Sequence, residues 1–330
     1  SENGVQDLIA RIVDAIYTAA EYDEFLLFKY LLIKSISKGK MYPVAFDATT
    51  MKTGAVAFRG ASNKLTSMSN EYNESRVHTT TPKADQYIFM DANFNAQYDV
   101  DVLAAAFNMD KAEFMGRLLL IDDFTTFDND RFAEIRTNSD MIEEVTSTEL
   151  ALMANVKAVL VDKEWFQVYD NLAQFDEKYV ASGIYWNYFY HVWKTFSYSP
   201  FSNAIVFVDD AATVSDPSTL TVTVLGVTVS GDQKILTLGV DPASATVQHY
   251  NIEFVEDSTA VSKAIAVHPY GAVIMGTDST ATTYVVKYTL KAKCGNSTYT
   301  ATSAIYVADY ATDSASATAV GDTITLTKDV

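Results

Sequence analysis

The sequence predicts a chain of two parts, an α+β domain over residues 1–208 and an all-β sandwich over residues 209–330. Apolar residues at three- and four-residue spacing open the chain, strands and helices then alternate irregularly, and apolar residues alternate with threonine near the end. Amino-acid usage changes at the same boundary, because all six arginines and all three tryptophans precede residue 209. The predicted boundary is Asp209–Asp210, directly after an apolar run.

A single long helix is predicted over about residues 5–38. The apolar residues of its first half lie on one face of the helix. Those from Phe25 to Ile36 lie around almost the whole circumference of the helix, which predicts burial on more than one side. Gly39 is the predicted stop signal. Such a helix would be about 50 Å long at 1.5 Å per residue, and a kink near Tyr22–Glu24 would shorten it. The residues of the one-sided face are Val5, Leu8, Ile9, Ile12, Val13 and Ile16.

Between this helix and residue 208 the sequence predicts short elements without regular βαβ order, which favours α+β over a doubly wound sheet. Short helices are predicted over 100–108, capped by Asp99 or Asp101, and over 149–155. The polar residues 63–81 and the acidic residues 125–139 are predicted to be exposed loops. The predicted strands are 42–46, a buried strand at 118–121, 158–161, and two strands within 183–208 that turn at Ser199–Pro200.

The second part is predicted to contain only strands. Leu220, Val222 and Val224 alternate with threonine, and similar alternation covers residues 284–292 and 299–307. Clusters of Gly, Asp, Asn and Ser separate about seven such strands, a spacing typical of a β-sandwich.

Composition excludes several classes of protein. Hydrophobic residues make up 48% and charged residues 20%, which excludes a disordered chain. The net charge of −18 disfavours an exposed nucleic-acid-binding surface. Cys294 is the single cysteine, so no disulfide can form within the chain. The most apolar run, Phe25 to Ile33, is too short to span a bilayer and contains Lys29, and no secretory signal pattern opens the chain.

The sequence contains no recognisable catalytic, cofactor-binding or metal-binding motif. The patterns GxSxG, GxGxxG and HExxH and a phosphate-binding loop do not occur. The four histidines are predicted to be structural or exposed: His78 lies in a polar loop, His191 in an aromatic strand, and His249 and His268 near strand ends without other ligands at metal-binding spacing. We therefore predict no catalytic residue, no cofactor and no metal.

Two clusters allow more than one interpretation. Asp122, Asp123, Asp128 and Asp130 could bind calcium, but the EF-hand glycine and terminal glutamate are missing, which favours a solvated acidic loop. The second cluster could be a sugar-stacking platform, a strand buried on both sides, or a subunit interface. Neighbouring strand residues point to opposite faces, which favours the last two. The second cluster consists of Tyr185, Trp186, Tyr188, Phe189, Tyr190, Trp193 and Phe196.

Five segments of the first part resemble the major head (capsid) proteins of phi-29-like small podophages of Gram-positive bacteria. The resemblance implies the Hong Kong 97 (Johnson) coat fold, with residues 5–38 as its spine helix and a peripheral sheet that makes lateral contacts. The N-terminal arm and extended loop that precede the spine helix in that fold have no counterpart here, so their contacts are not carried over. The matching segments occur in the family's order and are 12–24, 99–116, 159–171, 183–196 and 201–208.

Residues 213–308 resemble a bacterial Ig-like group 2 domain, on the segments 271–276, 284–290 and 299–302. Together the two resemblances imply a structural protein, not an enzyme, that self-assembles into the hexamers and pentamers of an icosahedral bacteriophage head. The head would enclose double-stranded DNA without sequence-specific binding, and the Ig-like domain would be displayed outside. The implied partners are copies of itself and scaffolding, portal and head-fibre proteins, with no membrane and no cofactor. The implied location is the virion, assembled in the host cytoplasm.

Two alternatives remain open at this stage. The chain could be a bacterial cell-surface binding module that carries an Ig-like domain. It could also be a glycan-active enzyme that uses the aromatic cluster as a platform and Asp122 or Asp123 as acid or base. The enzyme would need two carboxylates about 5–10 Å apart in a cleft.

Overall fold

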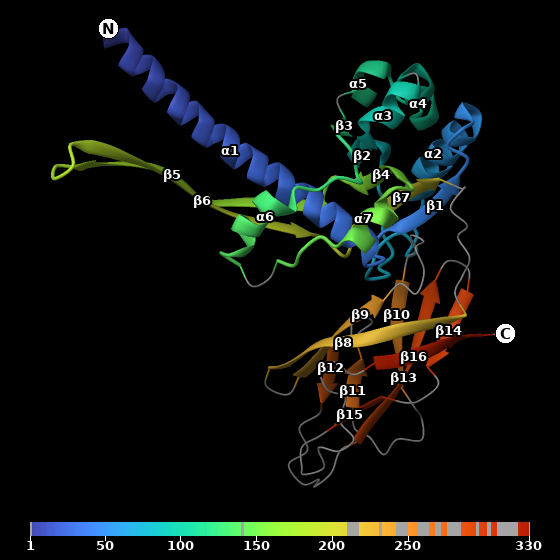
Figure 1. Ribbon diagram of the computed structural model, residues 1–330. Coiled ribbons are helices and arrows are strands. Elements are labelled where there is room, and N and C mark those ends of the chain that lie inside the picture. The colour runs from blue at the N-terminus through green and yellow to red at the C-terminus, as the bar shows by residue number, and fades with distance from the viewer. Residues whose placement is uncertain are drawn as a thin grey trace.

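The computed structural model describes residues 2–98, 100–115, 117–139, 142–209, 218–230, 233–241, 250–256, 264–267, 272–275, 285–294, 297–301, 305–308 and 323–329. In these residues the first part is a mixed α+β fold and the second part contains only strands (Figure 1). The helices of the first part are α1 (Glu2–Ser37), α2 (Met51–Leu65), the 3-10 turn η1 (Lys83–Asp85), α3 (Ala92–Gln97), α4 (Val100–Phe107), α5 (Lys111–Met115), α6 (Asn129–Arg136) and α7 (Ser147–Met153).

A mixed five-stranded sheet forms the centre of the first part. Its order is β1-β7-β4-β2-β3; the outer pairs β1/β7 and β2/β3 are parallel and the inner pairs are antiparallel. The central strands β4 and β7 are buried along nearly their whole length. The strands are β1 (Tyr42–Phe46), β2 (Gln86–Asp91), β3 (Leu118–Ile121), β4 (Val156–Asp162) and β7 (Ala204–Asp209).

The sheet separates two hydrophobic cores. Alternate residues of β7 point to opposite faces: Val206 belongs to the core under α1 and α7, and Phe207 belongs to the core under α2, α3 and α4. Val159 and Leu160 of β4 divide in the same way. Because helices cover both faces of the sheet, this period of two explains why the unbroken apolar runs 158–161 of β4 and 204–208 of β7 contain no polar residue.

Helix α1 is one continuous helix, as predicted, and it ends where predicted. Gly39 has a φ of 69°, which glycine adopts without a steric penalty. The Lys40 amide donates to the Ser35 carbonyl at 2.8 Å and the Gly39 amide donates to Ile36 at 3.1 Å. These two bonds form a Schellman motif, which satisfies carbonyls that the helix end leaves free.

A long two-stranded hairpin, β5 (Phe166–Val180) and β6 (Tyr185–Tyr198), projects from the rest of the first part on the same side as α1, and the two diverge toward their ends (Figure 1). Its strands are antiparallel over their whole length, with one irregularity between Asp170 and Leu172. The chain then turns near Pro200 into β7, as predicted for residues 183–208.

The second part is all-β in the residues that the structure describes, and its strands form one hydrogen-bonded sheet of nine rather than the predicted seven. The order is β10-β13-β14-β16-β8-β9-β12-β11, with β15 paired to β13. Leu220, Val222, Leu290, Tyr299 and Leu326 are buried. The sandwich and Ig-like assignments stay predictions, since much of 213–308 lies outside the described residues. The strands are β8 (Thr219–Ser230), β9 (Gln233–Asp241), β10 (Tyr250–Glu256), β11 (Ala264–Val267), β12 (Ala272–Met275), β13 (Val285–Cys294), β14 (Ser297–Ala301), β15 (Ile305–Ala308) and β16 (Thr323–Lys328).

Several local predictions were wrong. Residues 125–139 are not only a loop, because they contain α6, which Asp128 caps by accepting from the Arg131 amide. The predicted loop at 63–81 begins inside α2, a helix that the sequence analysis did not predict. The strand at 118–121 exists, but it is an edge strand whose Leu119 and Leu120 are exposed rather than buried. The predicted cap Asp99 lies outside the described residues.

Candidate interaction surface

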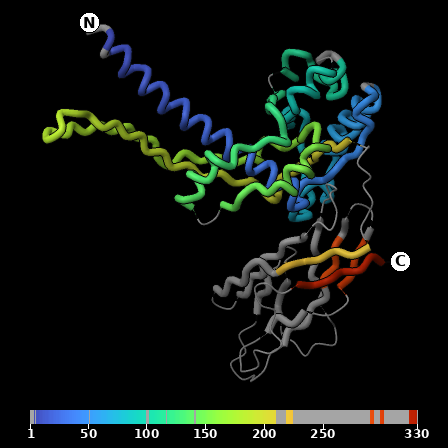
Figure 2. Tube along the Cα trace, in the orientation of Figure 1, coloured from blue at the N-terminus to red at the C-terminus, as the bar shows by residue number. Residues whose placement is uncertain are grey.

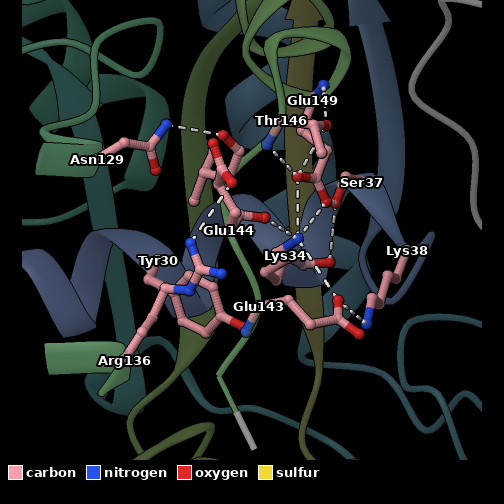
Figure 3. A network of polar contacts seen from close by, with 11 residues as sticks. Tyr30, Lys34, Ser37, Lys38, Asn129, Arg136, Glu143, Glu144, Thr146 and Glu149 are labelled. Carbon is pink, nitrogen blue, oxygen red and sulfur yellow. Dashed lines mark hydrogen bonds and ion pairs between the residues drawn. The ribbon is translucent and has the colours of Figure 1, made fainter. Parts of the chain in front are cut away.

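Two buried lysines hold the second half of α1 against the body. Lys34 is 10% exposed, and its Nζ donates to Glu149 Oε1 at 2.9 Å and to the Glu144 carbonyl at 2.8 Å (Figure 3). Glu149 also accepts from the Thr146 amide at the start of α7, in a capping box. Burial acts to raise the pKa of the Glu149 carboxyl, but the hydrogen bonds from Lys34 and Thr146 outweigh it, so its pKa lies below the usual value.

Three of the four aspartates of the predicted acidic loop have a local structural role, and the fourth is exposed. Asp122 accepts from the buried Lys29 at 2.9 Å. Asp123 accepts from the Thr125 amide and hydroxyl. Asp128 caps α6, where the bond from the Arg131 amide and then the bond from the Tyr22 hydroxyl lower the pKa of its carboxyl. Asp130 lies exposed in the first turn of α6.

No group of three or more His, Cys, Asp or Glu side chains among the described residues could hold a metal ion. Asp122, one of the two residues proposed as acid or base, has a side chain 59% exposed and is paired with a lysine. Asp123 is occupied by its own turn. These contacts give Asp122 and Asp123 a structural explanation, and neither the calcium alternative nor the enzyme alternative gains support from the geometry.

Arg131 and Tyr22 tie the middle of α1 to α6. Arg131 makes a two-pronged ion pair with Asp23, with Nε–Oδ1 and Nη2–Oδ2 distances of 2.7 and 2.6 Å. The Tyr22 hydroxyl donates to Asp128 at 3.0 Å. Further toward the N-terminus, α1 contacts the hairpin.

The hairpin packs on α1 through aromatic rings and one lysine. Tyr17 stacks on Phe175 and meets Tyr190 edge-on, with ring centroids 6.4 and 4.9 Å apart. Lys194 of β6 contacts Glu24 at 2.6 Å and Asp170 at 3.1 Å, and the hydrogen bond to Glu24 is the main reason why the pKa of Lys194 is raised. These contacts cover one side of the first half of α1 and leave the other sides open.

The first half of α1 and the hairpin together expose many large apolar side chains, which we call the arm surface. Leu8 is 58% exposed and Trp193 is 66% exposed. Exposed apolar groups this dense are unusual on an isolated soluble subunit and mark a contact surface. Its members are Leu8, Ile9, Ile12, Tyr17 and Tyr22 of α1 and Val168, Tyr169, Leu172, Tyr179, Ile184, Tyr185, Trp186, Phe189, Val192 and Trp193 of the hairpin.

The tip of the hairpin carries a strained apolar residue. Ile184 has a φ of 54°, a conformation that β-branched residues rarely adopt, and its side chain is 82% exposed. Gly183 beside it is closely covered by the Tyr185 ring, which would lie 2.4 Å from an added Cβ. An exposed isoleucine in a strained turn is a further feature of a surface that lacks its partner.

The structure decides between the alternatives for the aromatic cluster. The strand that carries it is not buried on both sides within the chain, because neighbouring residues that point to opposite faces, such as Tyr185 and Trp186, are both about half exposed. An interface between molecules is therefore the remaining favoured interpretation. His191 lies on this strand, 3.8 Å from Asp176, and is exposed. His78 is exposed, as predicted, and His249 and His268 lie outside the described residues.

Sequence reasoning missed the buried lysines. The available signal was the presence of Lys29 and Lys34 inside a stretch that is otherwise apolar almost all round, which implies buried partners. Their partners Asp122 and Glu149 lie 93 and 115 residues away, so no local pattern identifies them. None of the described helices combines the length and apolar character needed to cross a membrane.

Comparisons with known proteins place the chain among phage capsid proteins. The major capsid protein of Bacillus phage GA-1 is 33% identical over 267 residues, which cover 78% of this chain and 51% of that protein. The major capsid proteins of Bacillus phages B103 and PZA are each 36% identical, over 64% and 62% of this chain and 43% and 41% of theirs. The chain thus spans about half the length of the curated relatives that it matches.

Solved structures of phages were also found. The capsid structure of Staphylococcus phage Andhra aligns with a TM-score of 0.44 at 14% identity, over 63% of this chain and 65% of that one. The structure of the head fiber and inner core protein gp22 of native bacteriophage P68 aligns with a TM-score of 0.43 at 13% identity, over the same shares.

The family model is the most direct finding. A model described as Phi29-like phage major capsid protein matches residues 1–208, the whole of the first part and well over half of the chain. The curated relatives are capsid proteins and not enzymes. The chain therefore belongs to the Phi29-like phage major capsid protein family.

Proposed function

We propose that copies of this chain assemble into the hexamers and pentamers of an icosahedral phage head, with a Hong Kong 97-type coat domain over residues 1–208 and α1 as its spine helix. The observation that carries the proposal is the arm surface. Fifteen large apolar side chains are exposed along α1 and the hairpin. A soluble monomer rarely exposes so large an apolar surface. Family membership supports a shell as the assembly that covers them.

A closed shell explains how such a surface becomes stable. Each contact between neighbours need only be modest, because every copy contacts several others and the contacts reinforce one another. The aromatic side chains of the hairpin suit this role, since Trp and Tyr bury a large area with few rotatable bonds. The strained turn at Ile184 would be offset by burial against a neighbour.

The head would enclose double-stranded DNA without sequence-specific contacts. The net charge of −18 supports a wall that does not bind the packaged genome tightly, with an acidic inner face. Assembly would take place in the host cytoplasm, and scaffolding, portal and head-fibre proteins would be its further partners.

We assign residues 209–330 to a separate β-domain, with residues 213–308 as an Ig-like group 2 domain on the outside of the head. The all-β character of the described strands supports this assignment. In the described part of the chain, no strand of this sheet pairs with the five-stranded sheet of the first part, which supports a domain boundary after β7.

The decisive measurement is the mass of the native material by light scattering and electron microscopy. We expect megadalton particles built from hexameric and pentameric units, rather than a 36.4 kDa monomer. Substitution of Leu8 and Ile12 together by Ser should prevent particle formation and leave the fold of the subunit intact, because both side chains are exposed.

The matched control is Met68→Ser, which removes a side chain that is 71% exposed but lies outside the arm surface. This variant should assemble normally. A stable wild-type monomer at all concentrations would contradict the proposal and favour a surface-binding module. Normal assembly of the Leu8/Ile12 double variant would show that the first half of α1 is not part of the contact.

A further inference from the structure

Helix α2 carries a basic face in an acidic chain. Lys52, Val56, Arg59 and Asn63 are all exposed, and their spacing of four, three and four residues places them along one side of the helix. Val56 is 66% exposed. The helix contains three basic residues and no acidic residue, although the chain as a whole has a net charge of −18. We call these four residues together with Gly60 the basic face.

Gly60 on this face has no explanation within the chain. A Cβ added at Gly60 would meet nothing within 4 Å, whereas one added at Gly54 of the same helix would lie 2.9 Å from the Tyr98 hydroxyl. Glycine inside a helix is unfavourable relative to alanine by about 0.5–1 kcal/mol. A glycine in open space beside an exposed valine is suited to the close approach of another backbone.

The first half of α1 carries a complementary acidic stripe. Asp7, Asp14 and Glu21 are exposed and lie seven residues apart, so they follow one side of the helix at intervals of about 10.5 Å. Lys52 and Arg59 are also seven residues apart, at the same interval. The two helices therefore present opposite charges in matching register.

These charges have few partners within one copy. In the described part of the chain, Lys52, Arg59, Asp14 and Glu21 make no ion pair. Asp7 reaches Arg11 at 3.7 Å, with both side chains more than 70% exposed. Such exposed pairs contribute little to the stability of the subunit, so the charges remain available for a contact between copies.

The acidic stripe and the basic face of one copy cannot meet. The first half of α1 projects from one end of the first part, and α2 lies at the other end, beyond the five-stranded sheet (Figures 1 and 2). The two helices also cover different cores, since α1 packs with α7 and α2 packs with α4. A contact between these surfaces therefore has to join two copies.

We propose that the acidic stripe of α1 in one copy docks on the basic face of α2 in a neighbouring copy. The contact is heterologous, since two different surfaces meet, and repeated contacts of this kind form a ring when the rotation between neighbouring copies closes. This inference rests on the proposed self-assembly and names one of its contacts. Nucleic acid is the less favoured occupant, because non-specific binding requires the neutralisation of many phosphates and this face offers few cations.

Charge reversal tests the contact in the full-length chain. Lys52→Glu combined with Arg59→Glu should raise the critical concentration for assembly by about tenfold or more, since two attractions become repulsions at each contact. The matched control is Lys64→Glu, which reverses an exposed charge on the same helix outside the basic face and should assemble as wild type. Circular dichroism should show that both variants are folded.

A charge swap separates a direct contact from an indirect effect. Asp14→Lys combined with Glu21→Lys should impair assembly alone, and should restore assembly when combined with the reversed basic face. Normal assembly of the Lys52/Arg59 double variant, or failure of the swap to restore assembly, would overturn the inference. A loss of DNA binding in a filter assay with unchanged assembly would overturn it in favour of nucleic acid. If the wild-type chain does not assemble, the proposed function fails first, and the inference fails with it.

Discussion

At the scale of single residues, the buried lysines determine how α1 sits on the body. Lys29 and Lys34 are almost fully buried and each has a carboxylate partner at 2.9 Å. A buried ion pair adds little net stability compared with well-packed apolar residues, because both charges lose water. An unpaired buried charge is costly, however, so only one placement of the helix satisfies both lysines. Their role is to specify position.

Loss of the Glu149 charge should destabilise the fold in a pH-dependent way. Glu149→Gln should lower the free energy of unfolding by about 1–3 kcal/mol near neutral pH, since it weakens the charged hydrogen bonds to Lys34. The native pKa of Glu149 lies below its usual value of 4.5, so this stabilisation is complete well above pH 4.5 and is lost as the pH falls through the native pKa. The difference in the free energy of unfolding between the wild type and Glu149→Gln should therefore become smaller at acidic pH. Chemical denaturation at several pH values measures it.

Glu144→Gln is the matched control in the same network. The Glu144 side chain is 60% exposed and reaches Arg136 at 3.4 Å, whereas its backbone carbonyl, which the substitution keeps, is the group that accepts from Lys34 (Figure 3). Its loss should change stability by less than about 1 kcal/mol. Equal effects of the two substitutions on stability would contradict this role of Glu149. So would a difference in the free energy of unfolding between the wild type and Glu149→Gln that stays constant down to pH 3.

At the scale of elements, α1 and α2 each have one side that does not pack against the rest of the subunit. The second half of α1 is buried by both α7 and the sheet, and the first half keeps an apolar face in solvent. Helix α2 buries Phe58, Ala61 and Leu65 and leaves the basic face free. Each helix therefore packs one side against the rest of the chain and leaves another side exposed to solvent.

The two glycines of α2 should respond in opposite ways to the same substitution. Gly60→Ala should raise the free energy of unfolding by about 0.5–1 kcal/mol, because the added methyl group meets open space and the helix gains rigidity. Gly54→Ala should lower it by about 1–3 kcal/mol, because its Cβ would crowd the buried Tyr98 ring. Denaturation followed by tryptophan fluorescence reports on the first part, which holds all three tryptophans. Destabilisation by Gly60→Ala would show that the subunit itself requires this glycine.

At the scale of the whole molecule, the chain joins two parts of different architecture, a mixed α+β part and a part whose described elements are all strands. The first part builds a sheet between two helix-covered cores, with an arm surface that needs a partner. The second part forms a separate sheet, and apolar residues of its described strands, such as Leu220 and Tyr299, are buried. This division agrees with our proposal that the first part makes the contacts of the shell and the second part is displayed.

Outward display of the second part predicts where the C-terminus can be detected. An epitope tag added after Val330 should bind its antibody on intact particles as strongly as on dissociated subunits, because the strand β16 that ends near it belongs to the part that we propose is displayed. Immunogold labelling and pull-down of intact particles measure this. Binding that occurs only after the particles are disrupted would place the second part inside the head.

Local sequence patterns predicted the elements that depend on neighbouring residues. The long helix, its stop at Gly39, the strands at 42–46 and 158–161 and the all-β character of the second part follow from periodicity and from turn residues, which act within a few positions. The resemblance of five segments also predicted the family. Helix α2 was missed because glycine and β-branched residues weaken its local pattern, and the core under it supplies the missing stability.

Tertiary structure decided what depends on distant residues. It paired Lys34 with Glu149 across 115 residues, placed Leu119 and Leu120 on an exposed edge, and left the aromatic hairpin in solvent. A pattern of apolar residues predicts that a surface is buried. It does not show whether the residues that bury it belong to the same chain or to another chain. The amino-acid sequence by itself therefore determined the family and the elements with strong local patterns, and only the fold showed which apolar and charged faces remain exposed, because their cover depends on distant residues.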